Sequence, residues 1–180
     1  MVLTSLYNHC YFNATVPDNW KGSILCPIYK KGDPTLAANY HLIALLELEA
    51  TAYAPALLSH LEAWVVKNDI VPHFQSEFRE RASTIDNIIA LSYVSYQAFK
   101  PNHLPLFCCL VDYSAAFDRV DRPTLWRTLR DWGIPDALLN AIISLHTGTW
   151  VCVKTSATSV TGKIFTSQGL KQVCTSPPVV

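Results

Sequence analysis

An almost unbroken apolar run of eight residues, Leu104 to Val111, is the strongest hydrophobic pattern in the chain. A run of this length with a β-branched end predicts a strand that is buried on both faces. The run stops at Asp112, and a charge at the end of a buried strand is costly unless something pairs with it. Ligands gather outside the carboxyl ends of strands in α/β sheets, and Mg²⁺ would satisfy an aspartate there. The competing interpretation of Asp112 is a turn former or a helix cap.

Apolar residues at helical spacing predict helices on both sides of this run. The predicted helices cover residues 51–67, 85–99 and 136–146, and another opens at Arg122-Pro123 and ends at Gly133. Pro55 should lie near the first turn of its helix, and Ser83 or Thr84 should cap the helix that follows. The stripes expected to face the core are Leu57, Leu58, Leu61, Trp64 and Val65 in the first helix, and Ile85, Ile88, Ile89, Tyr93 and Tyr96 in the second.

Shorter apolar stretches predict strands. One covers residues 22–29 and leads into a turn at residues 30–34, where Lys30 and Lys31 stand. Residues 150–154 and 163–166 alternate as two strands of a hairpin. Residues 1–20 have the pattern of a helix end followed by a connection.

Length and charge limit the function classes. The chain has 180 residues, enough for one domain with a core or two small subdomains. Half of the residues are hydrophobic and 16% are charged, which excludes a disordered segment. The formal net charge is zero, whereas proteins that grip a phosphate backbone are normally basic. Neutrality argues against strong nucleic-acid binding by this chain alone.

The cysteines and the amino-terminal residues indicate the cellular compartment in which the protein is expected. The six cysteines form no Cys-x-x-Cys pair and no zinc spacing, and Cys108 and Cys109 are expected to be buried, reduced thiols. We expect an intracellular setting, with nucleus and cytoplasm not distinguished. The amino terminus lacks a signal-peptide pattern, and no apolar run approaches the ~20 residues needed to span a bilayer, so no membrane association is expected.

The stretch Asp112-Tyr-Ser-Ala-Ala-Phe117-Asp, followed by Arg119-Val and Leu125-Trp, resembles the first-aspartate motif of reverse transcriptases, most closely those of non-LTR (LINE-type) retrotransposons. The resemblance implies that Asp112 is a catalytic residue that holds Mg²⁺. It also implies that Phe117 lies under the sugar of the incoming nucleotide and rejects a 2′-hydroxyl. Without the resemblance, a core aromatic would be the preferred interpretation of Phe117.

A second segment, with Pro27, Lys30-Lys-Gly-Asp33 and Asn39-Tyr, is similar to the fingers of these polymerases, whose basic residues face the nucleotide triphosphate. Lys30 and Lys31 would then meet phosphates; the alternative is a solvated loop tip. His41 occupies the position of the family's arginine. A neutral imidazole cannot make the bidentate, permanently charged phosphate contact of a guanidinium.

Two further segments extend the resemblance over about residues 16–178. Residues 75–84 resemble a family loop in which Arg79 would touch template backbone, with a structural salt bridge equally open. Residues 168–177 resemble the loop under the templating base, where Gln172 would support the nucleotide. Val173 stands where the family has a glycine that lets backbone approach the nucleotide.

The resemblance implies an α+β fold: a fingers-like portion over residues 1–103 and a partial palm over 104–180 of a right-hand polymerase, together one truncated reverse transcriptase domain. RNA template and DNA primer would be its partners, with the oligomeric state open. The sequence contains no Asp-Asp pair, and two-metal phosphoryl transfer needs several acidic oxygens. We therefore expect an inactive fragment. The alternatives are a non-catalytic module that binds nucleic acid or protein, and a decaying reading frame that folds poorly.

Overall fold

The computed structural model describes residues 2–72, 74–76, 83–100 and 105–170. Its chain divides into two compact units. Unit 1 contains residues 1–64 and 115–180, and unit 2 contains residues 65–114. Unit 1 is therefore built from the two ends of the chain.

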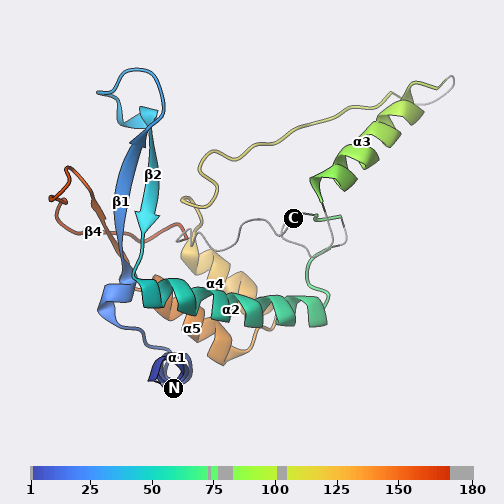
Figure 1. The fold of residues 1–180 in the computed structure, drawn as a ribbon. Helices are drawn as coiled ribbons and strands as arrows, with labels where there is room; N and C mark the ends of the chain where they lie inside the picture. The colour runs from blue at the N-terminus through green and yellow to red at the C-terminus, as the bar shows by residue number, and fades with distance from the viewer. Residues whose placement is uncertain (1, 73, 77–82, 101–104, 171–180) are drawn as a thin grey trace. The chain divides into compact units, whose positions relative to one another are not determined.

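A four-stranded sheet in the order β2-β1-β3-β4 forms one part of unit 1 (Figure 1). The strands are β1 (Gly22–Tyr29), β2 (Tyr40–Leu45), β3 (Trp150–Val153) and β4 (Ile164–Phe165). β1 pairs antiparallel with β2 and parallel with β3, and β3 pairs antiparallel with β4. Pro27 lies beyond the residues of β1 that pair with β3, where a strand tolerates a residue without an N–H. The parallel pair joins the amino-terminal and carboxyl-terminal parts of unit 1.

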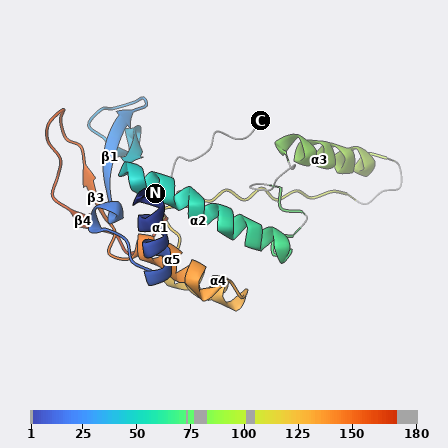
Figure 2. The same ribbon diagram turned by 60° about the horizontal axis from the view of Figure 1, so that its bottom comes forward.

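The helices of unit 1 supply its core. They are α1 (Val2–Asn13), α2 (Leu48–Lys67, in unit 1 up to Trp64), α4 (Arg122–Asp131) and α5 (Asp136–His146), with short 3₁₀ turns η1 (Asp18–Lys21) and η2 (Ala37–Asn39). α5 packs against both α1 and α4 (Figure 2). The rings of Tyr7, Trp20 and Tyr53 meet with centroids 5.1–5.9 Å apart. Trp20 and Tyr53 belong to one buried cluster with the α5 residues Leu138, Leu139 and Ala141, and the partly buried Tyr7 packs against it.

Local signals in the sequence set the ends of α4 as predicted, whereas α2 begins at Leu48 rather than at residue 51. The Asp121 carboxylate accepts a hydrogen bond from the Thr124 N–H at 2.9 Å, and Pro123 lies in the first turn of α4. Gly133, at a φ of 83°, follows the end of α4. The predicted bounds of β1 and of the helix at 136–146 are confirmed, and the mixed α+β class is confirmed with them.

Helix α3 (Thr84–Ala98) is the one helix wholly within the described part of unit 2. Ser83 caps it in a capping box with Asp86, which confirms the predicted start. Its apolar stripe, however, is exposed: Ile85, Ile88, Ile89, Tyr93 and Tyr96 are each about 60% exposed, so the predicted burial is wrong. Helical spacing marks the face that could be buried, but burial also needs a covering surface.

The predicted strand at 104–111 is also wrong, because described residues 105–113 have no strand pairing. Phe107 is 89% and Leu110 is 92% exposed, and the thiols of Cys108 and Cys109 are exposed rather than buried. A β-strand is stable only when neighbouring strands take up its N–H and C=O groups. Among the residues that the structure describes, no segment does so for this run.

Three smaller corrections concern unit 1. β2 was not predicted as a strand, and Leu58 of α2 is exposed rather than in the core. Pro55 lies inside α2 rather than in its first turn, so it has no N–H to donate to the Thr51 carbonyl. Within the described ranges, no helix combines the length and the apolar character needed to cross a membrane.

Candidate functional site

The β1–β2 hairpin of unit 1 carries three of the predicted nucleotide-binding residues. Lys30 and Lys31 follow the last residue of β1, and His41 lies on β2 opposite Ile28. All three side chains are exposed. The Lys30 N–H donates to the Asn39 carbonyl at 2.9 Å, which continues the hairpin pairing into the loop. The structure therefore brings these three residues onto one element.

The loop between the two strands is held by its own hydrogen bonds. The Thr35 N–H and hydroxyl donate to Asp33 Oδ1 at 2.8 and 2.7 Å, and these bonds lower the pKa of the Asp33 carboxyl. The Asn39 amide donates to the Asp33 carbonyl at 2.8 Å. Gly32 has a φ of +98°, a conformation that L side chains rarely adopt. Lys30 and Lys31 therefore lie on a loop whose conformation is fixed by hydrogen bonds.

Phe117 lies in a tight turn of residues 115–120, which we call the Phe117 turn. The Asp118 and Arg119 N–H groups both donate to the Ala115 carbonyl at 3.1 Å. The Phe117 side chain is 49% exposed, so within the described residues it is not a core aromatic. The Phe117 turn therefore presents the ring at the surface of unit 1.

A second segment, residues 168–170, lies directly against the Phe117 turn. The Leu170 N–H donates to the Phe117 carbonyl at 3.0 Å, and the Gly169 N–H donates to the Val120 carbonyl at 2.9 Å. A Cβ at Gly169 would stand 2.7 Å from the Asp118 carbonyl oxygen, so the two backbones are in contact. The structure therefore joins Phe117 to the segment that leads to Gln172.

Arg122, the first residue of α4, was not singled out as a functional candidate from the sequence. Its side chain is 7% exposed and donates to the Gly169 and Gln168 carbonyls at 2.7 and 3.2 Å. Burial lowers the pKa of its guanidinium from the usual value. In the sequence, Arg122 is visible only as an arginine beside a first-turn proline. Its hydrogen-bond partners are 24 to 47 residues away along the chain, so no local pattern marks it as a tertiary contact.

The other predicted site residues are placed differently. Asp112 belongs to unit 2, and its side chain is exposed after a stretch without strand pairing. Arg79 and Gln172 lie outside the described residues. No group of three histidine, cysteine or acidic side chains forms a metal site within the ranges that the structure covers. Asp112 alone does not make the multi-carboxylate site of a two-metal reaction.

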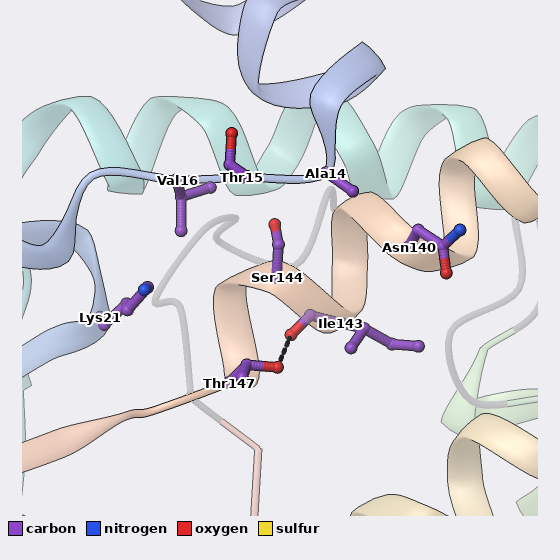
Figure 3. Close-up of a pocket in the computed structure, with 8 residues that line it drawn as sticks. All are labelled: Ala14, Thr15, Val16, Lys21, Asn140, Ile143, Ser144 and Thr147. Carbon is purple, nitrogen blue, oxygen red and sulfur yellow. Dashed lines mark hydrogen bonds between the residues drawn. The ribbon is translucent and has the colours of Figure 1, made fainter.

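A surface hollow of about 440 Å³ lies in unit 1 between the connection after α1 and helix α5 (Figure 3). It is lined by Ala14, Thr15, Val16, Lys21, Asn140, Ile143, Ser144 and Thr147. The Lys21 ammonium is 2.9 Å from Asp18 Oδ1, and this hydrogen bond lowers the pKa of the Asp18 carboxyl. The Ser144 and Thr147 hydroxyls donate to carbonyls of their own helix. None of the predicted site residues lines this hollow.

Unit 1 therefore combines a mixed α+β fold with a hairpin that bears two exposed lysines and a turn that exposes an aromatic ring. The family model described as reverse transcriptase (RNA-dependent DNA polymerase) matches residues 28–180, and the chain belongs to this family. A comparison with curated proteins gave no match. Reverse transcriptases generally depend on divalent metal and act on an RNA template with a primer.

Proposed function

We propose that this chain is a reverse transcriptase domain of the non-LTR retrotransposon type, with a fingers-like portion at 1–103 and a partial palm at 104–180. The family match over residues 28–180 carries the proposal. In this proposal Asp112 holds Mg²⁺ and Phe117 selects deoxynucleotides. Lys30, Lys31 and His41 face the triphosphate from the β1–β2 hairpin. RNA template and DNA primer are the nucleic-acid partners, with Arg79 on the template backbone and Gln172 under the nucleotide.

The geometry of unit 1 supports two parts of this assignment. The lysines are exposed on a loop with defined hydrogen bonds, and the salt bridge found within the described residues, Lys21 to Asp18, involves neither of them. With respect to these residues, an ammonium group can reach a phosphate without first breaking an ion pair. Phe117 is half exposed and adjoins residues 169–170 through backbone hydrogen bonds. A steric gate needs an exposed ring on a fixed backbone, and the half-exposed ring and the backbone hydrogen bonds of the Phe117 turn support this role.

We further propose that these 180 residues do not polymerise by themselves. Two metal ions need several acidic oxygens to activate the 3′-hydroxyl and stabilise the leaving pyrophosphate, and the resemblance assigns only Asp112 to that role. His41 is a second reason, because an imidazole stands where the family has a guanidinium that makes a bidentate, permanently charged phosphate contact. Val173 adds a side chain where the family has glycine.

The test is primer extension by the purified chain with an RNA template, a DNA primer, deoxynucleotides and Mg²⁺. The expected result is no extension above a no-protein control. Extension that Asp112→Asn abolishes would refute the inactivity and support the role of Asp112. In that case Phe117→Val should raise ribonucleotide incorporation, and an unchanged deoxy-to-ribo ratio would contradict the gate.

The second candidate function is a non-catalytic module of retrotransposon origin that binds nucleic acid or protein. The exposed pair Lys30 and Lys31 on an ordered loop favours it, because such a loop can meet a phosphate backbone without catalysis. Affinity for an RNA–DNA primer–template should then fall steeply with salt. Changing Lys30 or Lys31 singly to alanine should reduce the salt slope by about one, and Lys154→Ala, which removes one charge at an exposed lysine elsewhere, is the charge-matched control for each single change. Affinity indifferent to salt would count against this module.

A further inference from the structure

The guanidinium of Arg122 joins four separate places in unit 1. Besides the Gly169 and Gln168 carbonyls, it donates to the His146 carbonyl at 2.7 Å, the Thr149 hydroxyl at 2.9 Å and the Thr166 carbonyl at 3.2 Å. These acceptors belong to the last residue of α5, the residue before β3, the residue after β4 and the 168–170 segment. They are 24 to 47 residues away along the chain. Arg122 is thus a tertiary connection rather than a helix-start residue alone.

All five acceptors are neutral oxygens, so among the residues that the structure describes the buried positive charge is stabilised by dipoles and not by a carboxylate. The His146 carbonyl belongs to the last residue of α5, where the helix dipole favours a cation. The fork of the guanidinium allows Nε and Nη2 to bond the 168–170 segment while the two N–H groups of Nη1 are shared among the other three acceptors. A lysine has one nitrogen with three N–H groups, so it cannot reproduce all five of these bonds.

The 168–170 segment is consequently held from two directions. Arg122 binds its carbonyls, and the Phe117 turn accepts its N–H groups, through Leu170 to Phe117 and Gly169 to Val120. Gly169 is needed at this contact, because its φ is +78° and a Cβ would meet the Asp118 backbone at 2.7 Å. Loss of the guanidinium bonds would free one side of the segment, and the two backbone bonds to the Phe117 turn would be left to fix it among the described residues.

We infer that Arg122 is a positioning residue that fixes the 168–170 segment against the Phe117 turn. The relevance of this to nucleotide selection rests on the proposed function, in which Phe117 is the gate and the segment leads to Gln172. The positioning itself requires no nucleotide. The two can therefore be tested separately.

The first experiment measures hydrogen exchange in the unaltered 180-residue chain by NMR. The Arg122 Nε–H and the Gly169 and Leu170 amides should exchange through one shared opening, with protection factors that agree within about threefold. Protected Arg122 with unprotected Gly169 and Leu170 would overturn the inference. This measurement needs no variant and so does not depend on how well a variant folds.

The second experiment compares Arg122→Lys with Arg127→Lys, an exposed arginine on the same helix. Arg122→Lys should raise exchange at the Gly169 and Leu170 amides about tenfold or more, because charge-assisted bonds to the segment are lost. Arg127→Lys should leave both amides unchanged. The Lys30 amide, bonded to Asn39 in the β1–β2 hairpin, should stay within about twofold in both variants. An equal loss at Lys30 would assign Arg122 to general stability and overturn the positioning role.

The third measurement connects the positioning to nucleotide selection. The ratio of deoxynucleotide to ribonucleotide affinity, measured on the chain with primer–template, should fall in Arg122→Lys and not in Arg127→Lys. If Phe117→Val leaves this ratio unchanged, the gate proposal fails, while the exchange experiments still decide the role of Arg122. A slower Gly169 and Leu170 exchange in Arg122→Lys would refute the inference outright.

Discussion

The Tyr53 hydroxyl gives the sharpest stability prediction. The side chain is 2% exposed in the core of unit 1, and its hydroxyl is the buried polar side-chain atom without a hydrogen-bond partner among the described residues. An unbonded hydroxyl in a protein interior costs about 1–3 kcal/mol. Tyr53→Phe keeps the ring and its contacts with Tyr7 and Trp20 and removes only that oxygen. We expect the free energy of unfolding to rise by about 1 kcal/mol, which raises Tm by ~2–4 °C.

The matched control is Tyr7→Phe. The Tyr7 hydroxyl donates to the Glu49 carbonyl at 2.9 Å, so the same chemical change should lower the free energy of unfolding by about 0.5–1.5 kcal/mol. Urea unfolding followed by tryptophan fluorescence suits both variants, because all five tryptophans lie in unit 1. If Tyr53→Phe is no more stable than the parent chain, the buried Tyr53 hydroxyl does not lower the free energy of unfolding, and the prediction is refuted.

The dependence of stability on alkaline pH is a second measurement of the environment of the Tyr53 hydroxyl. Burial, with smaller contributions from Cys10 and Tyr11, raises the pKa of Tyr53 to about 12. An unfolded tyrosine ionises near pH 10, so the stability tied to the neutral phenol is intact below pH 10 and is lost between pH 10 and 12. The loss approaches about 2.7 kcal/mol for two pH units. The stability advantage of Tyr53→Phe should therefore grow between pH 10 and 12, and a constant difference would contradict the raised pKa.

Two further predictions concern unit 1. Gly22→Ala should lower the free energy of unfolding by about 1–3 kcal/mol in urea, because a Cβ would stand 2.1 Å from the Trp150 ring. Gly162→Ala is the control and should be nearly neutral, because a Cβ there would have no atom within 4 Å. Equal effects of the two changes would refute the contact between Gly22 and Trp150. Thr35→Ala should raise the pKa of the Asp33 carboxyl towards its usual value in an NMR titration, because the Thr35 hydroxyl bond is the main cause of its lowering. An unmoved Asp33 pKa would show that the loop hydrogen bonds differ from those described.

Elements whose signals are local could be predicted from the sequence. The bounds of β1 and α5 follow from an apolar stretch and a proline-led helical pattern, and Ser83 caps α3 because a hydroxyl accepts the third N–H of the helix. The lysine turn after β1 was also recognised. β2 was missed, since its strand character depends on pairing with β1, and pairing is a property of two segments.

The candidate site was predictable in parts. The sequence named Phe117 and the segment near Gln172, and the structure adds that residues 169–170 bond directly to the Phe117 turn. The Arg122 connection could not be foreseen, because its acceptors are backbone carbonyls that any residue provides. The fold alone determines which carbonyls lie within hydrogen-bond distance of the Arg122 guanidinium, so no pattern of residue types in the sequence indicates them.

The errors in unit 2 share one physical cause. Apolar spacing states which side of α3 or of residues 104–111 would be buried, but not whether a covering surface exists. In the described part of unit 2 both are exposed, and Asp112 is exposed with them. A solvated carboxylate needs no partner, so the exposed Asp112 has no burial cost that a metal would have to offset. What supports Asp112 is the family match and its motif, and this makes primer extension, rather than burial, the deciding evidence for its role.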